Sequence, residues 1–297
     1  MNLDDFIIAC FCLIDDLLPS ILKGKRLRTR GPMPKLTDSE VLTMEVVGTY
    51  LGISQDKALY DYFRRHYAHF FPTLAGLHRT TFVRQAANLW AVKERLWCHL
   101  RDELIRYDPT VAIVDSLPLP VCRFARSSRC VRLREVAAYG KDHSGKQTIY
   151  GLRLHLRLCW PGLITQAFLA PANEQDFEMA PILTQGTWGL ALGDRNYWVP
   201  RIQQELRRQG VLLLAPYRRA SSPKSKATES PVLGRVRYLV DTVFGQLTDR
   251  CGLKRIWARD VWHLRNRLLR AFLMHTIGFL FNQQDEAPVL QLERLVA

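Results

Sequence analysis

Hydrophobic positions in the first hundred residues recur with helical spacing. The segment TDSEVLTMEVVGTYLG opens with Thr37, carries Glu40 three residues later and continues with regularly spaced apolar side chains. This is the spacing of a capping box, so the pattern predicts a helix that begins at Thr37. The stretches DKALYDYFRRHYAHFF and RTTFVRQAANLWAVKERLWCHLRDELIRY predict two more helices, the second running up to Pro109. Residues 1–108 are therefore predicted to form an all-helical domain.

Beyond Pro109 the pattern changes to short apolar runs that alternate with amphipathic segments. Strands are predicted over residues 111–114, 148–159, 163–169, 188–192 and 211–215, and helices over 177–184, 199–209 and 233–248. The first three strands follow one another directly, and the later ones alternate with helices. That order predicts an α/β domain, residues 109–283, with a mixed sheet that carries helices on its faces. Residues 284–297 are expected to form a C-terminal tail.

The composition narrows the class of partner. The chain has 297 residues, of which 47% are hydrophobic, a formal net charge of +14 and a sequence pI near 9.7. A chain of this length and composition can bury a sizeable hydrophobic core. Its positive charge favours a polyanion such as nucleic acid as the binding partner. No apolar stretch has the length of a membrane span or the flanks of a signal peptide. The seven irregularly spaced cysteines are typical of reduced thiols, so a soluble cytoplasmic protein without membrane contact is expected.

Two of the predicted strands are followed by a carboxylate. Asp115 follows the run VAIV, and Pro118 and Pro120 are expected to end that strand, while Asp194 follows LALG. An acid at the end of a buried strand either caps a turn or needs a partner, because it loses hydration. If the two strands are neighbours, the two acids lie side by side and require a positive charge between them. Mg²⁺ or Mn²⁺ is the simplest such charge, because both ions prefer oxygen ligands.

A third acid, Asp241, lies among apolar positions of the predicted helix in VRYLVDTVFGQL. An isolated carboxylate in that setting needs a partner, whereas Glu205 and Glu229 occupy poorer positions for a shared site. Arg237 precedes Asp241 by four residues and therefore lies on the same helix face. It is interpreted either as a contact to a phosphate or as a partner that holds Asp241.

Basic residues gather after the first and third acids. Those after the first acid are Arg123, Arg126, Arg129 and Arg132. Those after the third acid are Lys254, Arg255 and Arg259, with Trp257 among them. Charge runs are usually solvated faces, but the position of these runs beside the acids favours contacts to phosphate. Trp257 and Tyr197 are compatible both with stacking on an unpaired base and with core packing. Helix, turn and helix with a basic face in the first domain are compatible with DNA binding, although other helical bundles share this pattern.

Three further polar residues receive structural interpretations. Asn173 and Asp176 in PANEQD stand between a strand and a helix, which is typical of turn and cap residues. His155 alternates with apolar residues in LRLHLRL and is interpreted as part of the core.

The ordered motifs VDSLPLPVC, YGLRLHL, LAPANEQD, LGDRNY and VDTVFGQL, within residues 111–282, resemble bacterial insertion-sequence transposases of the DDE type. Within that group the chain is most similar to the insertion sequence nine-hundred-eighty-two family. The resemblance implies a ribonuclease H-like fold, with Asp115, Asp194 and Asp241 as catalytic acids that hold two Mg²⁺ ions, or Mn²⁺ in their place. The family has glutamate at the position of Asp241, which is one methylene longer.

The activity that this resemblance implies is cutting and joining of DNA. Hydrolysis at an end of the element frees a 3′-hydroxyl, which is then joined to target DNA. The implied partners are the terminal repeats, the target and further copies of the chain, as a homodimer or larger assembly in the bacterial cytoplasm, associated with the nucleoid. Two alternatives stay open: a nuclease of the same fold, and a catalytically impaired copy that only binds DNA because its third acid is too short.

Overall fold

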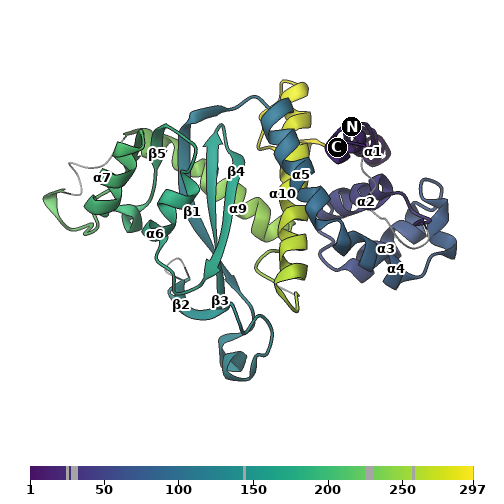
Figure 1. Ribbon diagram of the computed structural model, residues 1–297, viewed down its shortest axis with the longest axis horizontal. Coiled ribbons are helices and arrows are strands. Elements are labelled where there is room, and N and C mark those ends of the chain that lie inside the picture. Colours follow the sequence, from purple (N-terminus) through teal and green to yellow (C-terminus); the bar gives the residue numbers. More distant parts are fainter. Residues whose placement is uncertain (25–26, 28–32, 143–144, 225–230, 256–257, 297) are drawn as a thin grey trace. The chain divides into compact units, whose positions relative to one another are not determined.

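The computed structural model describes residues 1–24, 27, 33–142, 145–224, 231–255 and 258–296, and the chain divides into two compact units (Figure 1). One unit comprises Met1–Ile105, Gln246–Leu253 and Trp257–Ala297, and the other Arg106–Gly245 and Lys254–Ile256. The first border lies close to the predicted one at residue 108. The C-terminal border differs, because the last long helix groups with the N-terminal helices and not with the sheet that precedes it.

The first unit is entirely helical. Its α-helices are α1 (Leu3–Leu22), α2 (Asp38–Tyr50), α3 (Asp56–His66), α4 (Arg79–Asn88), α5 (Trp90–His99) and α10 (Val261–Gln284). Shorter 3₁₀ and π turns are η1 (Pro72–Gly76), η2 (Leu100–Leu104), η5 (Gln246–Arg250) and η6 (Leu292–Arg294). The capping box is confirmed, since the Glu40 amide donates to Thr37 Oγ1 over 3.1 Å and the Thr37 amide to Glu40 Oε2 over 2.6 Å. The long helix predicted before Pro109 is instead two helices that meet at Leu89, which has non-helical backbone angles.

A buried ion pair joins three helices of this unit. Lys93 of α5 contacts the Glu45 carboxylate of α2, and both side chains are almost fully buried. The Lys93 ammonium also donates to Asn266 Oδ1 of α10 over 2.5 Å and to the Ala86 carbonyl over 2.8 Å. Arg270 of α10 lies 3.9 Å from the other Glu45 oxygen. The surrounding side chains of α2 and α10 are mostly buried, so these charges sit inside the core of the helical unit.

The second unit is an α/β unit. Its strands are β1 (Asp108–Pro120), β2 (Ala138–Asp142), β3 (Gln147–Trp160), β4 (Leu163–Pro171), β5 (Gly189–Leu192) and β6 (Val211–Leu214). Its helices are α6 (Asp176–Leu183), α7 (Pro200–Arg208) and α9 (Pro231–Gly245), with 3₁₀ turns η3 (Phe124–Arg129) and η4 (Arg195–Tyr197). The sheet order is β2-β3-β1-β5-β6, with β4 also paired to β3. Pairs among β1 to β4 are antiparallel and those of β5 with β1 and β6 are parallel, so the predicted mixed sheet flanked by helices is confirmed.

Strand β1 is longer than the sequence predicts. It continues through Asp115 and pairs with β3 as far as Pro120, so the expectation that the prolines end the strand before them is wrong. Strand β5 pairs only with residues 111–113, and beyond them β1 has a neighbour on one side. Proline is tolerated there because an edge strand does not need every amide for pairing. Asp115 therefore lies within a strand, just where the parallel neighbour stops. Strand β2 was not predicted.

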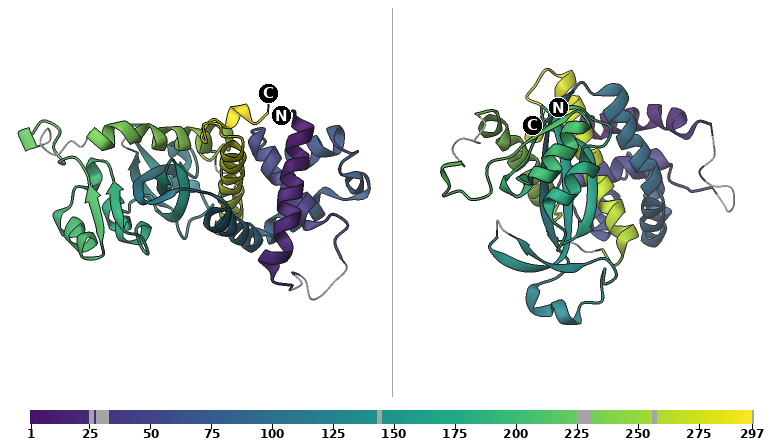
Figure 2. Two further views of the ribbon diagram at one scale, coloured as in Figure 1. Left: turned by 90° about the horizontal axis from the view of Figure 1, so that it is seen from above. Right: turned by 60° about the vertical axis from the view of Figure 1, so that its left-hand side comes forward.

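The two faces of the sheet carry different helices. Side chains alternate along a strand, so Arg153, His155 and Arg157 of β3 share one face and the leucines between them share the other. Arg157 Nη1 donates to the Leu183 carbonyl of α6 over 2.8 Å, which places α6 on the polar face. Helix α9 runs along the sheet (Figure 2) and contacts β1. No helix in the described part of the chain has the length and hydropathy of a membrane-spanning segment.

Replacing Lys93 by methionine is expected to lower the free energy of unfolding of the protein by about 3–5 kcal/mol, because Glu45 is left buried without its main partner. Chemical denaturation of the full chain measures this loss. A Lys93→Met, Glu45→Leu double variant removes both charges and should recover most of the stability. A single variant as stable as the native chain would contradict the role given to the pair.

Candidate active site

The structure brings two of the three predicted acids together. Ile113 of β1 lies opposite Leu192 of β5 in the parallel pair, and Asp115 and Asp194 each follow two residues later. Because side chains alternate along a strand, both acids leave the sheet on the same side. Each acid is half-buried, and the Asp194 charge acts on Asp115.

This neighbourhood favours the protonated form of Asp115. Burial raises the pKa of its carboxyl to about 7, and the negative charges of Asp194 and Asp176 act in the same direction. Two groups oppose this shift, the Ser116 amide, which donates to Asp115 Oδ1 over 2.7 Å, and the positive charge of Arg237. The negative charges around Asp115 therefore outweigh the positive charge of Arg237, as is expected of a pocket for a cation.

Asp194 is held by the turn that follows it. Its Oδ1 accepts the Asn196 amide over 2.9 Å and its Oδ2 accepts Asn196 Nδ2 over 3.1 Å. Gly193 allows this turn, because a Cβ there would lie 2.7 Å from Tyr197 Cγ. Tyr197 is fully buried in a hydrophobic cluster with α6 and α7, so in this structure it packs in the core and is not presented for stacking on a base.

Asp241 does not join the other two acids. It is exposed on α9, and within the described residues no three His, Cys, Asp or Glu side chains are grouped as a metal site requires. Helix α9 instead brings the charge of Arg237 to Asp115. Arg237 is itself exposed, so it remains accessible to a ligand.

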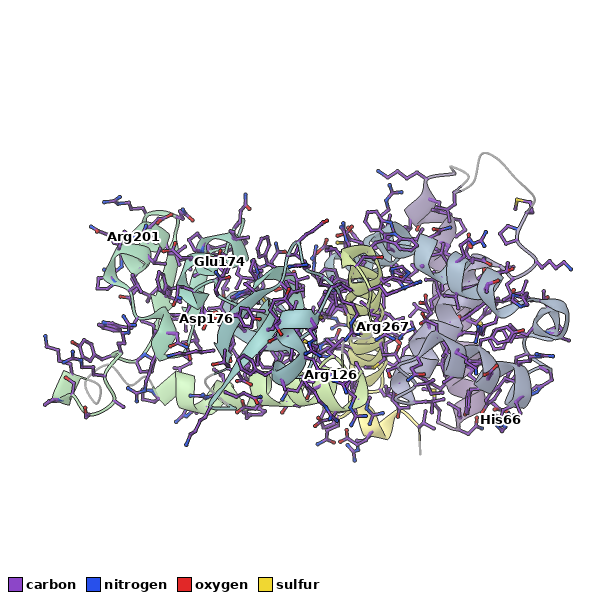
Figure 3. All side chains as sticks on the ribbon, turned by 90° about the horizontal axis from the view of Figure 1, so that it is seen from below. His66, Arg126, Glu174, Asp176, Arg201 and Arg267 are labelled. Carbon is purple, nitrogen blue, oxygen red and sulfur yellow. The ribbon has the colours of Figure 1, made fainter. Side chains whose placement is uncertain are left out.

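The basic residues divide into exposed and anchored ones. Arg123, Arg126 and Arg129 are exposed around η3 (Arg126 is labelled in Figure 3), as are Lys254, Arg255 and Arg259. Arg132 is half-buried and donates from Nη2 to the Val121 carbonyl over 2.9 Å, so part of its role is structural. Trp257 and Glu229 lie outside the described residues.

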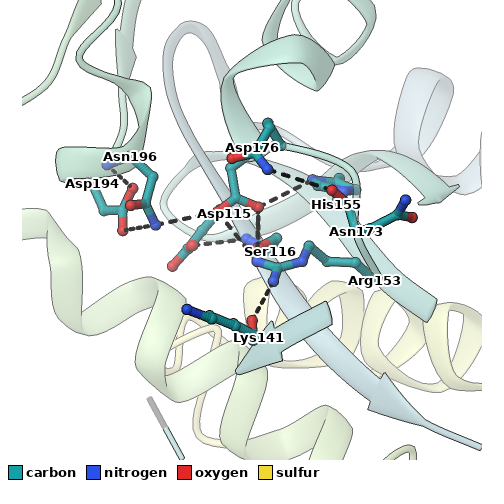
Figure 4. Close-up of polar contacts among 10 residues, drawn as sticks. Asp115, Ser116, Lys141, Arg153, His155, Asn173, Asp176, Asp194 and Asn196 are labelled. Atoms are coloured by element: carbon teal, nitrogen blue, oxygen red, sulfur yellow. Dashed lines mark hydrogen bonds and ion pairs between the residues drawn. The ribbon is translucent and has the colours of Figure 1, made fainter. Parts of the chain in front are cut away.

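Sequence reasoning missed a polar network beside the two acids (Figure 4). Asp176, interpreted from the sequence as a cap or turn residue, is buried in the first turn of α6, whose N-cap is Gln175. It forms an ion pair with Arg153 over 3.1 Å and accepts a hydrogen bond from Ser116 Oγ over 2.6 Å. The signal that could have revealed it is the alternation LRLHLRL, which places three polar side chains on one face of a long strand.

The buried histidine of the same face is neutral near pH 7. Burial lowers the pKa of His155 to about 4; the negative charge of Asp176 opposes this shift, and the charge of Arg153, a smaller effect than that of Asp176, adds to it. His155 Nδ1 lies 3.8 Å from Asp176 Oδ1. Arg153 is therefore the cation that balances Asp176, and the structural interpretation of His155 agrees with its complete burial.

Comparison with known proteins places this geometry in a family. Residues 107–260, more than half of the chain, match the family described as "Transposase DDE domain". The chain belongs to this family of DDE transposases. Its fold is also similar to a solved piggyBac transposase, described as a synaptic complex with hairpin DNA, with a TM-score of 0.52 and 10% sequence identity over 97% of this chain and 78% of that one. A search of curated proteins finds no match.

DDE transposase domains use divalent metal ions, and the donors of this transposase fit one in part. Two adjacent carboxylates in a site that raises the pKa of one of them suit a hard cation with oxygen ligands. A third protein carboxylate is not beside them in the described residues. The site thus offers two strand acids to such an ion.

Without divalent ions, the raised pKa of Asp115 should make the protein less stable as the pH rises. Between about pH 4 and pH 7 the folded chain holds a proton on Asp115 that the unfolded chain has released, so the stabilisation is complete at low pH and is lost as the pH passes through 7. An Asp115→Asn variant has no carboxyl to titrate at this position, so its stability should not fall for this reason as the pH rises. Its side-chain oxygen still accepts the hydrogen bond from the Ser116 amide.

The measurement is denaturant unfolding of both proteins in chelator at pH 5, 6 and 7. The free energy of unfolding of the variant should rise relative to the native chain with increasing pH, by at most about 1.4 kcal/mol per pH unit. A difference that does not change with pH would contradict the environment assigned to Asp115.

Proposed function

We propose that this DDE transposase belongs to a bacterial insertion sequence, of the nine-hundred-eighty-two kind, and cuts the ends of that element. It hydrolyses a phosphodiester bond at each end and joins the freed 3′-hydroxyl to target DNA. The observation that carries the proposal is the adjacency of Asp115 and Asp194 at neighbouring positions of the parallel pair β1 and β5.

In this proposal Asp115 and Asp194 are the first two ligands of Mg²⁺, or of Mn²⁺ in its place, in a site for two ions. Asp241 is the third ligand. Arg237, four residues before it on the same face of α9, already acts on Asp115, so a shift of α9 by about 6 Å along its axis would bring Asp241 toward the strand acids. Bound divalent ions supply positive charge to the phosphate and to the attacking and leaving oxygens.

The residues around the acids are proposed to hold the DNA backbone. Arg123, Arg126 and Arg129 are exposed within the α/β unit, as are Arg237, Lys254 and Arg255. Such side chains bind phosphate without reading sequence, and they make affinity strongly dependent on salt. Arg132 and Arg259 are assigned the same role. One guanidinium nitrogen of Arg132, Nη2, already donates a hydrogen bond to the Val121 carbonyl.

The helical unit is proposed as a second DNA-binding surface. A hollow of about 760 Å³ lies where α3, α4 and α10 begin, and its lining includes Lys57, Arg79, Arg84 and Arg267. The first three are exposed and have no ion-pair partner among the described residues. Burial lowers the pKa of Arg267 to about 10, so Arg267 still carries its charge at neutral pH. Helix N-termini add to the positive potential of such a surface.

The proposed partners are the terminal repeats and the target DNA, together with further copies of the chain as a homodimer or larger assembly. Support for DNA comes from the net charge of +14 and from the solved piggyBac transposase, whose description names hairpin DNA. We place the protein in the bacterial cytoplasm, associated with the nucleoid.

Cleavage of a labelled duplex that carries the terminal repeat tests the proposal. In Mg²⁺ or Mn²⁺ the native chain should cut at the end of the repeat, and Asp115→Ala and Asp194→Ala should reduce cutting below detection while DNA is still bound. Glu174→Ala, which removes an exposed acid of the same unit, is the control and should cut like the native chain. Native cutting by either aspartate variant would contradict the proposed site.

The exposure of Asp241 favours a second candidate function, binding of element ends without catalysis. Under that alternative the native chain binds the repeat and leaves it intact, and Asp241→Glu, which lengthens the side chain by one methylene, restores cutting. A chain that cuts but never joins a 3′-hydroxyl to target DNA would instead be a nuclease of the same fold.

The hollow in the helical unit gives a separate prediction about affinity. Lys57→Ala and Arg84→Ala should each weaken binding to duplex DNA by a similar factor whatever its sequence. Each should lower the slope of log affinity against log salt by about one, because one phosphate contact is lost. Titrations at several salt concentrations measure both quantities. Arg64→Ala, on α3 but outside the hollow, is the control, and equal effects from all three variants would contradict the assignment.

A further inference from the structure

Asp176 lies on the opposite face of β1 from Asp115 and is satisfied on all sides. Its side chain is 7% exposed, and Arg153 Nη1 donates to both of its oxygens, over 3.1 and 3.2 Å. Oδ1 also accepts from Ser116 Oγ over 2.6 Å, and Oδ2 accepts from Asn196 Nδ2 over 3.3 Å. A carboxylate with this many donors is poorly placed to bind a metal, so Asp176 is not a fourth acid of the site.

Ser116 connects Asp176 to the first strand acid. Its hydroxyl donates to Asp176, while its amide donates to Asp115 Oδ1 over 2.7 Å. The side chains of neighbouring residues in a strand point to opposite faces, so Ser116 reaches Asp176 on the α6 side while Asp115 faces the α9 side. One residue therefore links the two carboxylates through the edge of the sheet.

Asn196 connects Asp176 to the second strand acid. Its side-chain nitrogen donates both to Asp176 and to Asp194 Oδ2, the latter over 3.1 Å, and its amide donates to Asp194 Oδ1 over 2.9 Å. Figure 4 shows both connections meeting at Asp176. Asp115 and Asp194, which repel each other, are thus both connected by hydrogen bonds to the buried Arg153–Asp176 ion pair on the α6 face of the sheet.

We propose that Asp176 is a positioning residue of the reaction, which orients Asp115 and Asp194 toward a shared divalent cation through Ser116 and Asn196. This inference rests on the proposed function. Its physical reason is that a site of two like charges is disordered by their repulsion unless other groups fix the carboxylates before the ion arrives. Groups that hydrogen-bond to the ligands of a metal ion orient those ligands in this way, and their loss lowers metal affinity or activity by about 10–100-fold.

A purely structural role for Asp176 is the competing explanation. The Arg153–Asp176 pair joins β3 to α6, and breaking a buried pair is costly for the fold. Variants of Ser116 and Asn196 distinguish the two explanations, because replacing either residue leaves the Arg153–Asp176 ion pair in place. The explanations also separate at Thr165, whose buried hydroxyl accepts from Arg157 Nε on the same face of the sheet over 2.9 Å, so it supports the same polar row at Arg157.

The experiment measures Mn²⁺ affinity of the full chain by calorimetry in the absence of DNA, followed by cleavage of the repeat duplex. Ser116→Ala and Asn196→Ala should each lower Mn²⁺ affinity and cleavage by about 10–100-fold, with DNA affinity in chelator unchanged. Ser116→Thr keeps the hydroxyl and should behave like the native chain. Thr165→Val is the matched control, and it should keep native Mn²⁺ affinity even if its melting temperature falls.

The outcomes distinguish the inference from the function on which it rests. If both alanine variants bind Mn²⁺ and cut like the native chain while Asp115→Ala does neither, the positioning role is wrong and the proposed function stands. If Asp115→Ala also binds Mn²⁺ and cuts normally, the proposed function fails, and the inference fails with it. Asp176→Asn should resemble the alanine variants in Mn²⁺ affinity, and native affinity in a folded Asp176→Asn protein would overturn the inference.

Discussion

The repulsion between the Asp115 and Asp194 carboxylates is the constraint on which the rest of the α/β unit depends. Parallel pairing of β1 with β5 puts the two acids at equivalent positions just beyond the last paired residues. Burial and the nearby negative charges raise the pKa of Asp115 to about 7, so the ionised carboxylate is disfavoured unless a cation is bound beside it. The fold tolerates this arrangement because the acids receive hydrogen bonds from Ser116 and Asn196.

The sheet separates two kinds of environment around these acids. On the α6 side, Arg153, His155 and Arg157 form a buried polar row, and Arg153 of this row is ion-paired with Asp176. On the other side, α9 offers exposed Arg237 and Asp241. The first environment is suited to orientation, because its buried ion pair is hydrogen-bonded to Ser116 and Asn196 through Asp176. The second is accessible and suited to contact with an anionic polymer, which a DNA transposase must bind.

Much of this could be predicted from the sequence because the signals were local. The capping box at Thr37 and the succession of strands after Pro109 depend on neighbouring residues, and so does the position of the strand acids. The end of β1 was predicted wrongly because proline at an edge depends on whether a neighbouring strand is present, which is a property of the sheet. Asp176 was missed for the same reason, since its partners Ser116, Arg153 and Asn196 come from three separate segments. The placement of Asp241 depends on how α9 packs, which its apolar pattern does not determine.

The central claim is that Asp115 and Asp194 together bind a catalytic divalent ion. Anomalous diffraction from crystals of the full chain soaked in Mn²⁺ tests it most directly, because the metal is located independently of any activity. The account predicts a manganese peak in contact with both carboxylates. Manganese bound elsewhere, with neither acid as a ligand in a chain that still cuts DNA, would contradict it.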